Sequence, residues 1–423
     1  MKTALSALGR RTAPPPISWL MQTALSRPKL ISLAAGFTDN ETLPVELSRK
    51  LLTEILNDSK TGQPALQYGI TAGETNLRQL TARHLQKLDG ANIDSKAYSP
   101  DRLMITGGSQ QLLYMTLEAL CDEGDIVLVE DPTYFVFLSI LQSQGVRARG
   151  VKLERDGIDL AHLEKVLSQL KKSGQLRRVK ALYLVSYFQN PTGATTSFAK
   201  KSTALKILKR FEKAAGHPIY LVEDAAYREL RFAGDDIPSA LAIRGAAERV
   251  IYTGTYSKPF APGARVGFGI LPEEIFDVVN RIKGNHDFGT ANLLQQLLAG
   301  ALKSGLYDQH VAKIEKRYGQ KAAVMKKALS KHFPSAVEIW ESSGGLYFWA
   351  RLPKGIPAGV KSKIFQTALK NDVLYVPGEL CYADDPSRRK PVNEMRISFG
   401  NATEENIREG IKRLGAVLHE FVK

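Results

Sequence analysis

The chain has 423 residues, of which 43% are hydrophobic and 24% charged; this favours a large core and two or three domains. Its two cysteines, Cys121 and Cys381, lie far apart in the chain, which argues against a disulfide framework or a zinc site and favours a cytoplasmic location. No apolar run approaches the roughly 18 residues of a membrane helix, and the basic residues behind the net charge of +15 are scattered, so neither a membrane nor a nucleic-acid partner is expected.

The first 38 residues contain no acidic side chain, which is typical of a transit peptide. Pro14-Pro15-Pro16 would interrupt an amphipathic helix there, and residues 17–25 are typical of a folded element. We therefore expect a cytoplasmic protein, and the sequence leaves a targeting role for this segment open.

Residues from about 75 to 290 alternate apolar, β-rich runs with helical patterns. The alternation predicts an α/β fold with a mostly parallel sheet, in which ligands bind beyond the carboxyl ends of the strands. The predicted strands are Leu103–Thr106, Ile126–Glu130, Arg147–Val151, Lys180–Ser186, Ile219–Glu223, Val250–Gly254 and Ala264–Leu271, and the predicted helices include Gln110–Leu120, Leu160–Leu170 and Ser202–Ala215.

Beyond residue 290 the pattern changes to one long helical stretch over 291–332, four shorter strands and a terminal helix from about Glu404. The four strands are predicted at Ala336–Glu341, Leu346–Leu352, Val373–Val376 and Met395–Phe399. We expect an N-terminal arm (1–46) that joins a small α+β domain (301–423), with a large domain (47–300) between them.

The loop after the first predicted strand reads Gly107-Gly108-Ser109-Gln110 and opens a helix. Glycines let the backbone approach an anion closely, and the amides at a helix start bind phosphate. An ordinary helix start capped by Ser109 remains an alternative. Tyr134 follows the second predicted strand, where its ring could stack on a flat cofactor or simply pack beneath a loop.

Three polar residues follow two further predicted strands, Lys180–Ser186 and Ile219–Glu223. Asn190 begins an Asn-Pro-Thr-Gly turn, and Asp224 and Tyr227 come directly after an apolar strand. A carboxylate in such a place is costly unless a positive group pairs with it.

Lys258 lies between an apolar strand and a loop rich in proline and glycine, within Thr255-Tyr256-Ser257-Lys258, and Arg265 follows. Desolvation and cationic neighbours would lower the pKa of such a lysine and make its amine a nucleophile toward an aldehyde. An ordinary surface lysine is the alternative.

Together these strand ends match what pyridoxal 5′-phosphate (PLP) requires. The aldehyde needs Lys258 for a Schiff base, and the pyridine nitrogen needs a carboxylate, Asp224, that keeps it protonated. The phenolate oxygen needs donors, for which Asn190 and Tyr227 are placed, and Tyr134 would stack on the ring. The phosphate would be held by Gly108, Ser109, Gln110, Thr255, Ser257 and Arg265.

Over about residues 30–415 the sequence resembles the class I/II aminotransferases of the fold-type I PLP superfamily. The resemblance is carried by Asn-Pro-Thr-Gly, Asp-x-x-Tyr and Thr-x-Ser-Lys-x6-Arg in this order. Leu33-Ala34-Ala35-Gly36, Gln67-Tyr68-Gly69 and the Lys258 block resemble the branch of α-aminoadipate and kynurenine aminotransferases.

The resemblance implies three further site residues. It implies that Tyr68 reaches the PLP phosphate of a neighbouring subunit in a homodimer, that Arg396 holds the substrate α-carboxylate, and that Gly36 lines the substrate site together with Asn190. It also implies transfer of an amino group between an amino acid and a 2-oxo acid such as 2-oxoglutarate, with Lys258 as general base and acid and with Asp224 and Tyr227 as catalytic partners.

Alternatives remain at this stage. Another PLP reaction on the same fold, such as a C–S lyase, would use the same residues. A PLP-sensing transcription regulator would need a DNA-binding module of roughly 70 residues, for which about 30 residues before Leu33 leave little room. Arg27 could bind an acidic substrate side chain, or it is an ordinary surface arginine. Trp19 and Phe288 could favour apolar or aromatic substrates, or they serve core packing.

Overall fold

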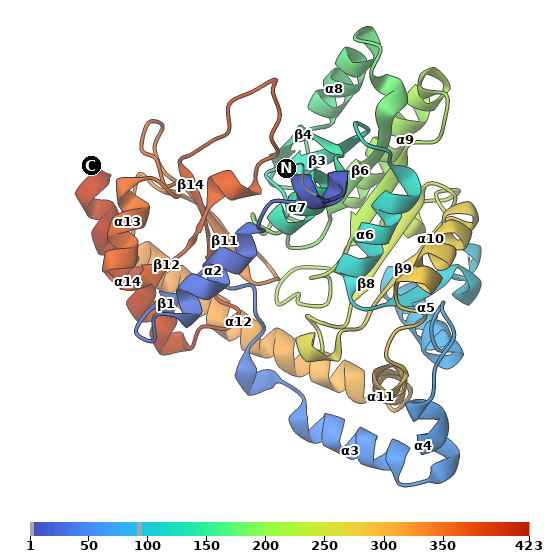
Figure 1. The fold of residues 1–423 in the computed structure, drawn as a ribbon. Coiled ribbons are helices and arrows are strands. Elements are labelled where there is room, and N and C mark those ends of the chain that lie inside the picture. Colours follow the sequence, from blue (N-terminus) through green and yellow to red (C-terminus); the bar gives the residue numbers. More distant parts are fainter. Residues whose placement is uncertain (1–3, 91–94, 423) are drawn as a thin grey trace.

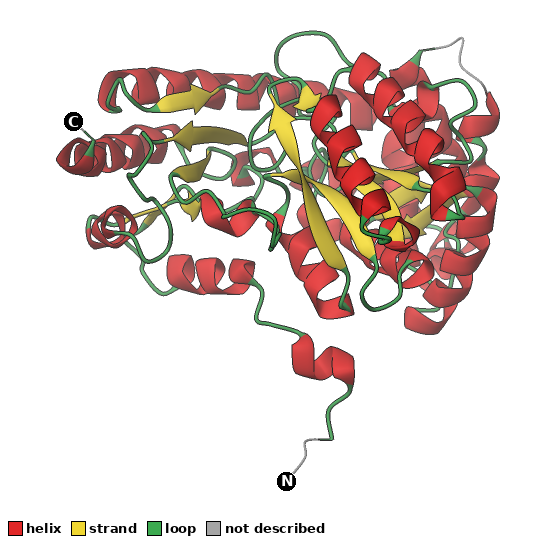
Figure 2. Cartoon of the chain, turned by 90° about the horizontal axis from the view of Figure 1, so that it is seen from above, coloured by secondary structure: helices red, strands yellow, loops and turns green. Residues whose placement is uncertain are grey.

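The computed structural model describes residues 4–90 and 95–422, so the extreme ends of the predicted first and last domains lie outside the described residues. Figures 1 and 2 show a large sheet with helices on both faces, beside a smaller group of strands and helices. The long helix α12 (Leu306–His332) runs from the first group to the second.

The large sheet has eight strands in the order β2-β9-β8-β7-β6-β3-β4-β5. Its strands are β2 Leu103–Thr106, β3 Ile126–Asp131, β4 Arg147–Glu154, β5 Gly157–Ile158, β6 Val179–Val185, β7 Tyr220–Asp224, β8 Val250–Thr255 and β9 Gly267–Ile270. The run from β8 to β4 is parallel, and β9 lies antiparallel between β8 and β2. This confirms the predicted α/β class and mostly parallel sheet. The central parallel strands β3, β6, β7 and β8 are buried along nearly their whole length, because helices cover both of their faces, whereas β4 is partly exposed.

The helices of this larger group include α6, which starts after β2, and α7, which starts after β3, whereas α3 and α4 pack against α11 and not on the sheet. They are α3 Val45–Leu56, α4 Ser59–Leu66, α5 Thr75–Asp89, α6 Ser109–Leu120, α7 Phe135–Gln144, α8 Leu160–Lys172, α9 Phe198–Ala215, α10 Glu273–His286 and α11 Asn292–Lys303. Because β3, β6, β7 and β8 run parallel, their carboxyl ends and the loops that follow them meet at one edge.

The smaller group is built on a four-stranded antiparallel sheet in the order β10-β11-β14-β13. Its elements are β10 Glu338–Trp340, β11 Tyr347–Arg351, α13 Lys363–Lys370, β13 Val376–Pro377, β14 Glu394–Ser398 and α14 Glu404–Phe421. Strand β1 (Ile31–Ser32) pairs in parallel with β12 (Val373–Leu374), which supports joining the N-terminal segment to this group. The domain boundaries at residues 46 and 300 stay predictions.

Three elements differ from the sequence prediction. The stretch 291–332 is broken into α11 and α12 at Gly305, which has φ +73° and therefore a conformation that ends a helix. The strand predicted from Ala264 begins only at Gly267, because Arg265 has φ +51° after a short 3₁₀ turn. The strand predicted at Val373–Val376 is divided between β12 and β13, which pair with different partners.

The N-terminal segment forms two short helices, α1 (Ala7–Arg11) and α2 (Pro16–Leu25). The triple proline separates them, and Pro16 occupies the first helical position, where the missing N–H costs nothing. Among the described residues, no helix has the length and apolar character needed to cross a membrane.

Candidate active site

The loop between β2 and α6 forms an anion cradle. Gly108 has φ +95° and precedes α6 as its N-cap, with no side chain capping the first turn, so the alternative of a Ser109 cap is wrong. A Cβ at Gly108 would lie 2.7 Å from Nη2 of Arg265. Arg265 also donates to the carbonyl of Gly107 (3.1 Å). The backbone amides at the start of α6 and one guanidinium therefore face the same small space, as a phosphate requires.

The opposite side of this cradle comes from the loop after β8. The Ser257 amide donates to Oγ1 of Thr255 (3.1 Å), and Arg265 Nη1 approaches Ser257 Oγ at 3.5 Å. Both hydroxyl side chains are buried. Of the residues predicted to hold the phosphate, the structure therefore brings together Gly108, Arg265, Thr255 and Ser257. Ser109 is half-buried at the helix start, whereas Gln110 is exposed.

Lys258 lies in the same loop and is half-buried. Its Nζ donates to the carbonyl of Gly36 at 2.8 Å and lies 5.9 Å from the centre of the Tyr227 ring. Burial, followed by the positive charges of Arg396 and Arg265, lowers the pKa of Lys258 to about 8. A far larger fraction of this amine is neutral near pH 7 than of a surface lysine.

Asp224 ends β7 and is 4% exposed. Its Oδ2 accepts a hydrogen bond from the Tyr183 hydroxyl (2.8 Å), and its Oδ1 accepts one from the Ala226 amide (3.1 Å). Burial raises the pKa of Asp224 to about 6, against these two donors. Within the described residues, no lysine or arginine forms an ion pair with this carboxylate, which leaves it free to pair with a cationic group of a ligand.

Asn190 connects the two sheets. Its Nδ2 donates to the Tyr227 hydroxyl (3.3 Å) on the large-sheet side, and its Oδ1 accepts from Nη1 of Arg396 (2.7 Å), which lies on β14 of the small sheet. Burial is the main cause that raises the pKa of Tyr227 well above its ordinary value, so this phenol stays protonated.

Arg396 is 2% exposed, and its guanidinium contacts two aromatic rings. Its guanidinium carbon lies 4.3 Å from the ring centre of Tyr347 and 5.5 Å from that of Phe135. One Nη donates to the Ala34 carbonyl (2.6 Å), while the Nε is buried without a partner. An unpaired donor on a buried guanidinium suits an incoming carboxylate.

Other predicted residues stand at the margin of this cluster. Tyr134 is half-buried directly before α7, and burial, followed by Tyr347 and Asp224, raises its pKa. Tyr68 is 82% exposed and contacts the ring of Phe288, so the structure does not bring it to the cluster of its own chain. Arg27 donates to the Leu369 carbonyl (3.3 Å) on α13, a contact that occupies one of its guanidinium nitrogens.

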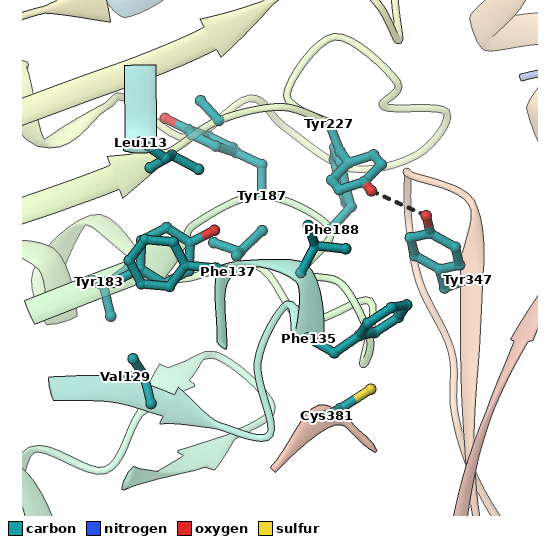
Figure 3. Packing of buried hydrophobic residues seen from close by; sticks show 14 of the residues in the cluster. Leu113, Val129, Phe135, Phe137, Tyr183, Tyr187, Phe188, Tyr227, Tyr347 and Cys381 are labelled. Atoms are coloured by element: carbon teal, nitrogen blue, oxygen red, sulfur yellow. Dashed lines mark hydrogen bonds between the residues drawn. The ribbon is translucent and has the colours of Figure 1, made fainter. Parts of the chain in front are cut away.

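Three residues of the site were not predicted from the sequence: Tyr347, Tyr183 and Phe135. In the β6–β7 register Val185 is the partner of Asp224, and Tyr183 lies two residues before Val185. The Tyr183 ring stacks on that of Phe137, with ring centroids 3.7 Å apart. Such diagonal neighbours on one face follow from strand register, which the sequence does not state. Figure 3 shows Tyr347 facing Tyr227, with Phe135 below them and Tyr183 against Phe137 on the other side of the view.

The residues present fit PLP. The cradle at Gly108 suits a phosphate, the unpaired carboxylate of Asp224 suits a protonated pyridine, and the amine of Lys258 suits an aldehyde. The described part of the chain holds no group of His, Cys, Asp and Glu suited to a metal ion.

Comparisons with known proteins agree with this geometry. The model of the family "Aminotransferase class I and II" matches residues 28–414. Aromatic-amino-acid aminotransferase 1 of Thermococcus litoralis is 33% identical, over 93% of this chain and 89% of its own. A kynurenine aminotransferase structure from Pyrococcus horikoshii, in complex with PMP, superposes with a TM-score of 0.89 at 32% identity and covers 99% of this chain and 98% of its own.

A third relative is the α-aminoadipate aminotransferase of Thermus thermophilus, whose structure contains N-(5′-phosphopyridoxyl)-L-leucine. It superposes with a TM-score of 0.83 at 30% identity and covers 99% of this chain and 98% of its own. The chain belongs to the class I and II aminotransferases, and it is a fold-type I, PLP-dependent enzyme of that family.

Proposed function

We propose that the cluster around Lys258 transfers the amino group of an α-amino acid to a 2-oxo acid, with 2-oxoglutarate as an acceptor. The observation that carries this proposal is the convergence of a lysine of lowered pKa, an unpaired buried carboxylate and a buried arginine with a free donor. Each of these groups is costly by itself in a folded protein, and each is explained by one part of the reaction.

The cofactor, when bound, supplies an aldehyde that receives the amino group and a ring that withdraws electrons from the substrate Cα. In this proposal Gly108, Ser109, Thr255, Ser257 and Arg265 hold its phosphate, and Gln110 lies at the same helix start. Asp224 would keep the pyridine nitrogen protonated, and Tyr134 would stack on the ring. Asn190 and Tyr227 donate toward the phenolate oxygen, since each has a polar hydrogen in the buried cluster.

Lys258 is the base that removes the proton from the substrate Cα, and it returns that proton at C4′ of the cofactor. Its amine is suited to both steps because a pKa of about 8 lets it exchange a proton readily near neutral pH. The Gly36 carbonyl, 2.8 Å from Nζ, holds the side chain on the substrate side of the site.

Arg396 binds the substrate α-carboxylate, with Asn190 orienting its guanidinium. The relatives named for aromatic amino acids, kynurenine and aminoadipate support donors with an aromatic or aminoadipate-type side chain, and the leucine adduct in the third supports aliphatic donors. A panel of such amino acids, each tested with 2-oxoglutarate and monitored by the visible absorbance of the cofactor, identifies the preferred donor.

The functional unit is a homodimer with shared active sites. Its support is a series of exposed apolar side chains on and near α3 and α4, which a monomer would leave in water: Val45, Leu56, Leu66, Tyr68, Ile70 and Phe288. Tyr68 would reach the phosphate bound by the partner subunit. The two free cysteines, Cys121 and Cys381, support a cytoplasmic location.

The dimer is tested by mixing two variants, Lys258→Ala and Tyr68→Ala, each weakly active alone. If Tyr68 serves the neighbouring site, a mixed dimer contains one site with both residues intact, and activity returns after subunit exchange. Activity that stays at the level of the separate variants would place Tyr68 in the site of its own chain or outside any site.

The reaction itself is tested with Lys258→Ala, which removes the amine and leaves the phosphate cradle intact. We expect turnover to fall by at least about 10⁴-fold, because both proton transfers lose their carrier, while PLP still binds non-covalently. Borohydride reduction, followed by mass measurement of the peptide, should label Lys258 in the parent protein and no lysine in the variant. Undiminished transfer in Lys258→Ala would refute the proposal.

A further inference from the structure

Tyr347 occupies a position between the two halves of the site. It lies on β11 of the small sheet and is 1% exposed, yet its hydroxyl is 3.0 Å from the hydroxyl of Tyr227 on the large-sheet side. Figure 3 shows the two phenols facing each other across this junction. The aromatic rings of the pair meet edge to face, with centroids 5.6 Å apart.

The ring of Tyr347 also supports Arg396. The register of β11 and β14 places Trp349 opposite Arg396, so Tyr347 is the diagonal neighbour of Arg396 on the same face. Its ring centre lies 4.3 Å from the guanidinium carbon, and Phe135 lies on the guanidinium at 5.5 Å. A planar cation held by two rings keeps one orientation, which favours bidentate binding of a carboxylate.

The hydroxyl group of Tyr347 also leaves no room for a side chain at Gly36. A Cβ at Gly36 would lie 2.6 Å from this oxygen, and the Gly36 carbonyl is the acceptor for Lys258. The side chain of Tyr347 thus contacts three parts of the site: the segment at Gly36, whose carbonyl accepts from Lys258, the hydroxyl of Tyr227, and the guanidinium of Arg396.

Either phenol can be the donor in the hydrogen bond between them, and the two directions have different consequences for the cofactor. Tyr227 has a single O–H, and Asn190 already donates to its oxygen. If Tyr347 is the donor to Tyr227, the proton of Tyr227 stays free for the phenolate oxygen of the cofactor. A donated hydrogen bond also makes the recipient hydroxyl a stronger donor itself.

We propose that Tyr347 is a positioning residue with two separable roles: its hydroxyl donates to Tyr227 and directs the Tyr227 proton at the cofactor, and its ring orients Arg396 for the substrate carboxylate. This inference rests on the proposed function. It adds a residue that links cofactor binding on the large sheet to substrate binding on the small sheet.

The hydroxyl role is tested with Tyr347→Phe, which keeps the ring. A weaker hydrogen bond from Tyr227 makes the phenolate oxygen more basic, so the lysine–cofactor imine keeps its proton to higher pH. We expect the pH midpoint of the visible absorbance of the bound cofactor to rise by about half a unit, from the size of one net hydrogen bond. Tyr227→Phe should raise it further, and Tyr227→Phe/Tyr347→Phe should match Tyr227→Phe alone.

The ring role is tested with Tyr347→Leu, compared with Tyr347→Phe as the matched control. Loss of the stacked ring should raise KM for the amino donor roughly 2–30-fold with a smaller change in kcat, whereas the Phe variant should keep KM within about 2-fold of the parent. The dissociation constant of a 2-methyl amino acid, which cannot lose a Cα proton, gives the same comparison without turnover.

Two results would overturn the inference. A Tyr347→Phe midpoint equal to that of the parent removes the hydroxyl role, and equal KM values for the Leu and Phe variants remove the ring role. Failure of the proposed function is distinct, because the parent protein would then show no lysine-bound cofactor or no amino transfer before any variant is made.

Discussion

The carboxyl edge of the large sheet and the face of the small antiparallel sheet both supply charged groups to the site. Asp224 and Lys258 come from the first: Asp224 is the last residue of β7, and Lys258 lies in the loop that follows β8. Arg396 comes from the middle of β14, where neighbouring strands and rings surround it. The first region is therefore suited to hold and activate a cofactor, and the second to recognise what is brought to it.

The environments of the charges differ accordingly. Asp224 and Lys258 have pKa values shifted toward neutrality, mainly by burial. Arg396 keeps two hydrogen-bond partners, Asn190 and the Ala34 carbonyl, and contacts the rings of Tyr347 and Phe135. Chemistry should thus depend on the large-sheet edge, and affinity for the substrate on the small sheet.

The substitution Asp224→Asn gives the strongest test of this division of roles. The amide keeps the size of the side chain but no longer stabilises a protonated pyridine nitrogen, so we expect kcat to fall about 10²–10³-fold with a small change in KM. Steady-state kinetics at several donor concentrations separate the two constants. A rise in KM with unchanged kcat would show that Asp224 serves substrate binding instead.

Arg396→Lys is the corresponding change on the small sheet. A lysine keeps the positive charge but loses the planar fork, so KM for the amino donor should rise about 10–100-fold while kcat falls less. The variant should retain the cofactor spectrum of the parent. Equal loss of kcat and kcat/KM would mean that Arg396 acts on the transition state and that the division of roles is wrong.

The smallest expected effect concerns the pH dependence of cofactor attachment. The neutral amine of Lys258 is the nucleophile, and its pKa of about 8 lies below that of an ordinary lysine. The rate at which the cofactor-free protein forms the lysine-bound state should therefore rise with pH and level off above about 8, where a surface lysine would continue to rise toward about 10.

Stopped-flow absorbance measures this profile, and Arg396 provides a control. Because its positive charge helps to lower the pKa of Lys258, Arg396→Gln should move the midpoint upward, whereas Arg396→Lys should leave it nearly unchanged. A midpoint near that of an ordinary lysine in the parent protein would show that burial does not shift this amine in solution.

Much of the large-sheet half of the site was predictable from local sequence. The motifs around Asn190, Asp224 and Lys258 follow strands whose apolar pattern is strong, and in a parallel sheet the ends of those strands meet. Prediction from local sequence was weaker for the half of the site that the small sheet and the N-terminal segment supply. Arg396 and Gly36 entered through family resemblance alone, and Tyr347 was not predicted at all.

The reason is the range of the interactions involved. Local patterns of the sequence determined which functional group follows which strand. A phosphate loop, an amide, a carboxylate and a lysine come in this order along the chain, and each is placed by a short apolar run and a turn. Only the tertiary structure decided that β11 lies beside β14, so that Tyr347 covers Arg396, and that the two sheets meet at the Tyr227 hydroxyl. Such contacts join residues far apart in the chain and depend on strand register and on packing between layers, which a period in the sequence does not specify.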